Sequence, residues 1–260
     1  MAARSIWNGT ISFGMVSIPV RLTTATSEKD ISFHMIHEEC GSRIKLLRWC
    51  PKHERAVERD EIVKGFEYAK GHHVIMDPSD FEKLPLGTKH TIEVMQFVEQ
   101  EEIDPIYYDK TYYLEPEEAG KKPYALFIKA LKKKGVTAIA QIAIREKESL
   151  CALRVMGGQL VMETLFYPDE IRETPDVKTD MEVGDKELKM AESLIDMLHE
   201  KFNPEAYKDH YREALQEVID AKLAGGEVKA VPEVEETQVI DLMDALRASV
   251  EAVKKEQKKA

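Results

Sequence analysis

The chain has 260 residues, a formal net charge of −11 and 43% hydrophobic residues. That hydrophobic content excludes a wholly disordered chain, and the length is sufficient to bury the core of one or two domains. No apolar run reaches the roughly 20 residues that a transmembrane helix needs. The first residues lack the apolar stretch of a signal peptide, and three cysteines are too few for a disulfide scaffold. We therefore expect a cytoplasmic protein with no membrane partner.

Charge is distributed in blocks along the chain. Residues 40–56 carry five basic side chains against one acidic, residues 91–118 carry nine acidic against one basic, and residues 119–160 carry nine basic against two acidic. An acidic total argues against nucleic acid as a partner only when the charge is evenly spread. Two interpretations stay open: ordinary solvated faces of strands and helices, or a cationic surface that holds phosphates beside an acidic outer one.

The first 180 residues contain short runs with strand periodicity. Apolar residues alternate with small or polar ones through Ile11, Phe13, Ile18 and Val20, as in half-buried strands. Further β-type runs cover residues 71–76, 91–98, 111–114, 136–145, 152–155 and 159–167. Proline and glycine residues between these runs indicate turns. Many short strands with this spacing favour an antiparallel barrel or sandwich.

Two short helices interrupt the predicted strands. Asp77-Pro78-Ser79 begins the first, because proline is favoured at the first position of a helix. The second begins at Pro123 and ends at Gly135, since glycine is typical of the residue that follows a helix.

After residue 180 the apolar period becomes helical. Residues 186–202 form one amphipathic segment, and Asn203-Pro204 predicts the start of a second helix that ends at Gly225-Gly226. A linker rich in Glu and Val follows, and residues 239–252 form a last amphipathic helix. The predicted parts are a β-rich core over 1–184, a helical arm over 185–226, and a linker with a C-terminal segment over 227–260.

His37, Cys40, Cys50 and His53 form two ligand pairs, each with two residues between its members. Such spacing lets both side chains of a turn face one tetrahedral zinc ion. We therefore expect a structural zinc ion held by a knuckle over residues 37–53, with all four positions filled and none open for catalysis. The alternative is two reduced thiols and two surface imidazoles.

No constellation of residues indicates an enzyme. Cys151 lies in an apolar run, so we interpret it as a buried core thiol rather than a nucleophile. His72 and His73 are interpreted as a surface pair. Gly157-Gly158 lacks the following Lys-Ser/Thr of a phosphate-binding loop. We therefore expect no catalytic residue and no bound nucleotide.

Three lysines, Lys132, Lys133 and Lys134, occupy the last turn of the second predicted helix. Lysines there complement the negative C-terminal pole of a helix, which is a sufficient local reason for them. The alternative is contact with phosphates. In the basic stretch over residues 40–56, Trp49 is the sole aromatic residue. That pattern favours sequence-independent contact with a duplex backbone over stacking on single-stranded bases.

Five stretches of the chain, in collinear order, resemble bacterial Ku, the family that binds DNA ends in non-homologous end joining. They are residues 5–21 (SIWNGTISFGMVSIPVR), 60–68 (DEIVKGFEY), 106–116 (IYYDKTYYLEP), 160–167 (LVMETLFY) and 239–249 (VIDLMDALRAS). The resemblance covers essentially the whole chain, and motifs of this length are more specific than any spacing of single residues.

The resemblance implies a β-rich α+β fold: a Ku-type β-barrel core with inserted bridge segments, a small helical subdomain and a C-terminal helix. It implies a ring-shaped homodimer that threads onto double-stranded DNA ends independently of sequence and protects them. It further implies recruitment and stimulation of the ATP-dependent DNA ligase D, with no nucleotide bound and no hydrolysis. Such a protein would associate with the nucleoid at DNA breaks.

Site residues follow from this resemblance together with the local charge. We predict DNA contacts from Arg43, Lys45, Arg48, Lys64, Lys132, Lys133 and Lys134. We predict ligase contacts from Val239, Ile240, Asp241, Leu242, Met243 and Leu246, because an apolar stripe beyond a polar linker needs a surface to cover it. Two rival interpretations stay open: a zinc-stabilised adaptor that binds protein without specificity for DNA ends, and an enzyme that uses Cys151 or the histidines.

Overall fold

The computed structural model of the chain describes residues 4–84, 88, 90–144, 147–225 and 242–257. The chain forms two compact units, Met1–Glu173 and Thr174–Ala260. Within the described residues, every helix is too short or too polar to cross a bilayer.

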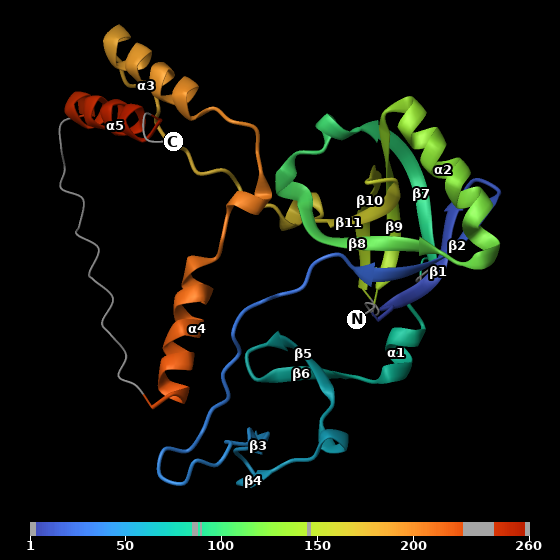
Figure 1. Cartoon of the computed structure of the whole chain (residues 1–260). Helices are drawn as coiled ribbons and strands as arrows, with labels where there is room; N and C mark the ends of the chain where they lie inside the picture. The colour runs from blue at the N-terminus through green and yellow to red at the C-terminus, as the bar shows by residue number, and fades with distance from the viewer. Residues whose placement is uncertain (1–3, 85–87, 89, 145–146, 226–241, 258–260) are drawn as a thin grey trace. The chain divides into compact units, whose positions relative to one another are not determined.

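Seven strands of the first unit close into a barrel (Figure 1). Their order around the barrel is β1-β2-β8-β11-β10-β9-β7, and β7 pairs back onto β1. Neighbouring strands run antiparallel, except that β1 and β7 run parallel. The strands are β1 (Trp7–Phe13), β2 (Val16–Thr24), β7 (Thr91–Glu99), β8 (Tyr108–Pro116), β9 (Val136–Ile144), β10 (Lys147–Met156) and β11 (Gln159–Leu165). The predicted β-rich barrel is confirmed.

Glycines make the tight connections between paired strands. Gly14 joins β1 to β2 with a φ of +58°, and Gly157 and Gly158 join β10 to β11 with φ values of +58° and +90°. Residues with side chains avoid this left-handed region, whereas two-residue hairpin turns require it. Short 3-10 turns lie at Arg59–Glu61, Gln100–Glu102, Pro105–Tyr107, Glu118–Gly120, Pro168–Glu170 and Pro204–Ala206.

Helix α2 (Lys121–Lys134) packs against the barrel core. Its buried residues recur at helical spacing and join the apolar side chains of the strands in one cluster. These helix residues are Tyr124, Phe127, Ile128 and Leu131. The helix ends at Gly135, as predicted, although it begins two residues before Pro123.

Between β2 and β7 the chain leaves the barrel for residues 24–84, which we call the insertion. It contains two small antiparallel sheets and one short helix. These elements are β3 (Trp49–Cys50) with β4 (Arg55–Ala56), β5 (Lys64–Ala69) with β6 (His72–Met76), and α1 (Pro78–Glu82). Helix α1 has Asp77 as its N-cap and Pro78 at its first position, as predicted. None of the residues 24–84 is buried, so the insertion has no core of its own.

The second unit consists of helices α3 (Asp185–Leu198), α4 (His210–Leu223) and α5 (Leu242–Gln257). Helices α3 and α5 lie against each other, as Figure 1 also shows. No residue of α3 or α4 is buried. The predicted linker over residues 227–237 lies outside the described residues.

The end of α3 differs from the sequence prediction. Residues 186–202 were expected to be helical, but α3 ends at Leu198 because His199 takes an extended backbone, with φ −73° and ψ 105°. Phe202 packs its ring near that of Tyr207, with 5.8 Å between the centroids. Phe202, the last residue of the apolar spacing that suggested a longer helix, therefore lies beyond the end of α3.

The start of α4 also differs from the prediction. Asn203-Pro204 begins only the 3-10 turn Pro204–Ala206, and the prediction of a helix from Pro204 is wrong. The helix starts at His210, where the carboxylate of Asp209 accepts a hydrogen bond from the Arg212 N–H at 2.9 Å. Both sites have a side-chain cap, so the capping signal alone does not tell a single turn from a helix.

Candidate functional site

Three of the predicted DNA-binding residues lie in one exposed run of the insertion. Arg43 pairs with Ile36 in an isolated β-bridge, and the carbonyl of Arg48 accepts a hydrogen bond from the Val57 N–H at 2.8 Å. Lys45 lies between them. The run therefore connects two hairpin turns, and none of its three cations forms an ion pair with another described residue.

Lys64 is also in the insertion, on β5. Its ammonium group lies 4.4 Å from the centroid of the Phe81 ring, which is within the range of a cation–π contact. The contact fixes the position of one exposed cation near α1.

The remaining three predicted cations, Lys132, Lys133 and Lys134, are exposed in the last turn of α2. Gly135 ends this helix with a φ of +69°, and its N–H donates to the Leu131 carbonyl at 2.8 Å. The lysines thus lie at the negative pole of the helix, and they make no ion pair with the described part of the chain. This geometry agrees with both interpretations of the three lysines: that they complement the negative pole of the helix, and that they contact phosphates.

The first predicted zinc pair lies in a tight hairpin turn. The His37 Nδ1 and Cys40 Sγ atoms are 3.2 Å apart, the His37 N–H donates to the Ser42 carbonyl at 2.8 Å, and the Gly41 N–H donates to the His37 carbonyl at 2.9 Å. Gly41 has a φ of +67°. Hydrogen bonds from Ser42 lower the pKa of the Cys40 thiol below its ordinary value.

The second pair lies in a hairpin of the same form. The Cys50 Sγ and His53 Nδ1 atoms are 3.4 Å apart, and the flanking residues pair as β3 and β4. Glu54, directly after His53, has a φ of +47°, a conformation that is uncommon for residues with side chains. Hydrogen bonds from His53 lower the pKa of the Cys50 thiol.

The two hairpins match position by position. In each, a bridged residue pair is followed by the first ligand, and a residue with positive φ comes directly after the second ligand. Each hairpin therefore presents two donors from one turn, as a zinc knuckle does. Among the described residues, no group of three or more His, Cys, Asp or Glu side chains is close enough to hold a metal ion. The structure therefore forms each His–Cys pair but does not bring the two pairs together into one four-ligand site.

The insertion also exposes a large set of apolar side chains, which sequence reasoning missed. Phe66 is 66% exposed, Tyr68 61% and Ile75 60%, all on the β5–β6 ribbon. The other members are Phe33, Met35, Ile36, Ile44, Leu46, Leu47, Trp49, Ile62, Val63, Val74 and Leu84. Phe66 and Tyr68 alternate with Gly65 and Glu67, which gave a signal for a strand with an apolar face, but nothing in the sequence shows that the barrel leaves that face uncovered.

The residues considered for catalysis are not arranged for it. Cys151 is fully buried, and burial raises the pKa of its thiol, which disfavours the nucleophilic thiolate. His72 and His73 are exposed on β6. A ring nitrogen of His72 lies 3.2 Å from the Lys70 carbonyl oxygen. The predictions of a core thiol and a surface pair are confirmed.

The predicted ligase-binding segment is described only in part. Val239, Ile240 and Asp241 lie outside the described residues, and Leu242 is the first residue of α5. Met243 and Leu246 are half-buried, in the helix that lies against α3. The apolar stripe of α5 is therefore partly covered within its own unit.

Comparison with known proteins identifies the barrel. Residues 12–190 match the model of the Ku70/Ku80 beta-barrel domain, which is more than half of the chain. The chain belongs to the Ku family. The resemblance carried by its five sequence stretches is thereby confirmed.

Relatives from three organisms agree with this assignment. A protein of Symbiobacterium thermophilum is 48% identical over 96% of this chain, one of Heliobacterium modesticaldum 44% over 100%, and one of Archaeoglobus fulgidus 41% over 96%. Each is named non-homologous end joining protein Ku. The chain spans 63% of the Symbiobacterium protein, 95% of the Heliobacterium protein and 100% of the Archaeoglobus protein.

Proposed function

We propose that the chain binds double-stranded DNA ends independently of sequence as a ring-shaped homodimer, protects them, and recruits ligase D in non-homologous end joining. Membership of the Ku family supports the reaction context. The observation that carries the proposal is the insertion: a long excursion from a closed barrel in which no residue is buried and which carries both exposed cations and exposed apolar side chains.

The apolar side chains of the insertion support the homodimer. An isolated two-stranded ribbon such as β5–β6 is marginally stable in water at best, and contiguous exposed apolar surface marks an interaction site. A second copy of the chain offers the same surface, so a two-fold axis would cover both insertions at once. The two insertions joined in this way would enclose a space between two barrels.

The cations of the insertion support backbone contact with DNA. Arg43, Lys45 and Arg48 are exposed and unpaired with other described residues, so they can neutralise phosphates without first breaking an ion pair. A ring retains a threaded duplex by topology, and modest contacts with phosphates are then sufficient. The acidic remainder of the molecule would repel DNA outside the ring.

A competition gel shift tests the proposal. A short labelled linear duplex is challenged with one plasmid, either covalently closed or linearised. If only linear plasmid competes, in proportion to its ends, the protein threads onto ends. Equal competition per base pair would contradict the ring, and no DNA binding at all would favour the zinc-stabilised adaptor.

Sedimentation tests the homodimer separately. Phe66→Asp places a carboxylate on the apolar face of β5 and should shift the protein from dimer to monomer while leaving barrel unfolding unchanged. Leu126→Asp, at a residue of α2 that is 65% exposed, is the matched control and should stay dimeric. A dimer that survives Phe66→Asp would place the interface elsewhere.

Recruitment of ligase D is assigned to the segment over residues 239–246. Val239→Asp with Ile240→Asp should abolish stimulation of ligation while DNA affinity stays unchanged. Ser249→Asp, at an exposed residue of α5, is the control and should have no effect. Stimulation that survives the double substitution would contradict the assignment.

A structural zinc ion joining the two hairpins is also part of the proposal. The donor set of two thiols and two imidazoles fits zinc, and the repeated hairpin form of the two pairs supports it. The ion would be held by His37, Cys40, Cys50 and His53 and would stiffen the insertion. Metal analysis of the purified protein should find one zinc per chain, lost in Cys40→Ser and kept in Cys151→Ser. Zinc-free protein that does not take up the metal would overturn this assignment.

A further inference from the structure

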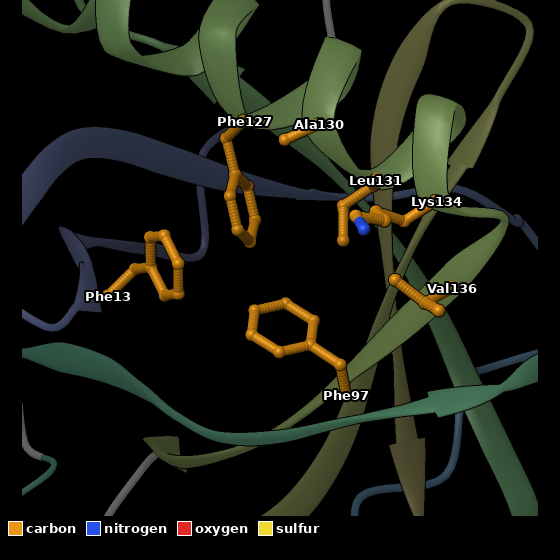
Figure 2. Close-up of a pocket in the computed structure, with 7 residues that line it drawn as sticks. All are labelled: Phe13, Phe97, Phe127, Ala130, Leu131, Lys134 and Val136. Carbon is orange, nitrogen blue, oxygen red and sulfur yellow. The ribbon is translucent and has the colours of Figure 1, made fainter.

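An apolar groove opens on the barrel beside α2, outside the insertion. Figure 2 shows the rings of Phe13, Phe97 and Phe127 facing one another across an open space, with Leu131 and Val136 along another side. These side chains come from β1, β7, α2 and the start of β9. The groove has a volume of about 290 Å³.

The three rings form a socket with two exposed walls. The ring centroids of Phe13 and Phe97 are 5.4 Å apart, those of Phe13 and Phe127 are 5.5 Å apart, and those of Phe97 and Phe127 are 6.5 Å apart. Phe127 is only 4% exposed, whereas Phe13 is 39% and Phe97 is 40% exposed. A fourth aromatic or branched side chain packed over the two exposed rings would cover both.

A β-bulge in β7 creates this socket. The pairing of β7 with β9 shifts between Val94 and Gln96, so the residue that follows the bulge changes face. Val94 packs against the barrel core, whereas Val98 packs against a second cluster of buried residues, Ile139, Ala152 and Leu165. Phe97 consequently faces the same side as Val94 and meets Phe127 of α2.

The charge around the groove is positive. Lys134 borders the apolar socket, and an adjoining hollow that shares Leu131 and Val136 is bordered by Lys132 and Arg154. Among the described residues, no carboxylate lines either hollow, although the chain has 48 acidic against 37 basic residues. Arg154 is already neutralised by Glu163, which leaves the two lysines as the cations available to a ligand.

We propose that this groove binds a short acidic segment of a partner protein. One bulky apolar side chain of the segment enters the groove and packs on the exposed surfaces of Phe13 and Phe97, and flanking carboxylates lie toward Lys132 and Lys134. Interfaces of this kind depend on one buried anchor with complementary charge around it.

The apolar socket distinguishes a protein segment from DNA. Lys132 and Lys134 belong to the cations predicted to contact phosphates, and a duplex backbone would satisfy their charge. A duplex backbone offers no apolar side chain to fill a space walled by three phenylalanine rings. The volume is also close to the lower limit of about 300 Å³ for small-molecule sites, which suits one or two side chains better than a cofactor.

Fluorescence polarisation with short labelled peptides tests the proposal on the full-length protein. The acidic probe has Phe and Leu flanked on both sides by Asp and Glu. One comparison peptide replaces Phe and Leu by Ala, and another replaces every acidic residue by Lys. We expect saturable binding of the acidic probe and a loss of affinity of roughly tenfold or more for each comparison peptide.

Two pairs of variants locate the probe. Ala130 is an exposed residue of α2 that borders the groove, so Ala130→Phe fills the groove. The matched control, Ala125→Phe, adds the same ring at an exposed position of α2 that does not border the groove. Lys134→Glu reverses the bordering charge, with Lys122→Glu, at an exposed position in the first turn of the same helix, as its control. We expect Ala130→Phe and Lys134→Glu to weaken binding of the acidic probe, and both controls to bind as the parent protein does.

Four outcomes would overturn the proposal. The first is that the acidic probe does not bind, and the second is that it binds Ala130→Phe as well as it binds the parent protein. The third is that Ala130→Phe lowers the affinity for linear duplex DNA while Ala125→Phe does not, which would assign the groove to DNA. The fourth is that Ala130→Phe changes the sedimentation of the protein from dimer to monomer, which would assign the groove to a second copy of the chain.

Discussion

At the scale of single residues, Tyr124 connects α2 to two strands of the barrel. Its hydroxyl donates to the Leu114 carbonyl at 2.6 Å and accepts from the Leu160 N–H at 2.9 Å. The side chain is 7% exposed, and burial raises the pKa of its hydroxyl. One hydroxyl therefore satisfies a backbone donor and a backbone acceptor that belong to two fully buried residues, Leu160 and Leu114.

Tyr124→Phe should lower the free energy of unfolding of the barrel by about 1–3 kcal/mol, because a backbone N–H and a carbonyl then stay buried without this partner. The midpoint of denaturant unfolding, followed by circular dichroism, measures the loss. Tyr113→Phe is the matched control, since the half-buried Tyr113 loses the same atom but does not belong to the core cluster; its midpoint should stay within the error of the parent. Equal midpoints for both variants would show that the two hydrogen bonds contribute nothing net.

At the scale of elements, the second hairpin of the insertion is held to the following 3-10 turn by one ion pair. Arg55 donates to both carboxylate oxygens of Glu61, with 3.0 Å between Nη1 and Oε2. The Glu58 N–H also donates to Glu61 at 2.9 Å. The Arg55 guanidinium, and next the Glu58 N–H, lower the pKa of the Glu61 carboxyl from 4.5 to about 2.

This lowered pKa fixes the direction of a pH dependence. A carboxyl whose pKa is lower in the folded state stabilises the fold above its ordinary pKa, and the stabilisation is lost as the pH falls from about 4.5 towards 2. Arg55→Gln should raise the Glu61 pKa part of the way back, because the Glu58 N–H remains. An NMR titration of the Glu61 carboxyl measures the change. Lys52→Gln removes a nearby charge that is not paired with Glu61, and it should leave the titration unmoved.

Much of the element pattern could be predicted because its causes are local in sequence. Strand alternation, the two glycines of the β10–β11 turn and the stop of α2 at Gly135 each depend on residues within a few positions of one another. The same holds for the two ligand pairs, since each His and Cys lie in one hairpin turn.

The rest depends on contacts between distant segments. The groove could not be predicted because Phe97 faces α2 only as a result of the bulge, and a one-residue slip changes the face of every later side chain. The early end of α3 is set by the extended backbone of His199, and the apolar spacing around that residue gave no sign of it. The exposed face of β5 depends on what the barrel leaves uncovered, and periodicity alone does not show that.

At the scale of the whole molecule, the barrel and the insertion of the first unit differ in how their apolar side chains are buried. The barrel and α2 bury a continuous core, whereas the insertion buries nothing. In the proposed homodimer the partner covers the insertion, whereas the barrel has a core of its own. Substitutions on the insertion should accordingly change assembly and DNA binding without changing barrel stability.

The salt dependence of DNA-end binding tests this division. Each phosphate neutralised by the protein releases counterions, so the logarithm of affinity falls linearly with the logarithm of salt concentration, by roughly 0.9 per contact. Replacing Arg43, Lys45 and Arg48 together by Glu should weaken binding and reduce the slope by about 3, one for each lost contact. Replacing Lys186, Lys189 and Lys201 by Glu changes the net charge by the same amount at exposed positions of the second unit. If that control reduces the slope equally, overall charge rather than these three residues governs the affinity. If only the substitution of Arg43, Lys45 and Arg48 reduces the slope, the insertion holds the phosphates. Both triple substitutions change the net charge equally, so a difference between their slopes must come from where the residues lie.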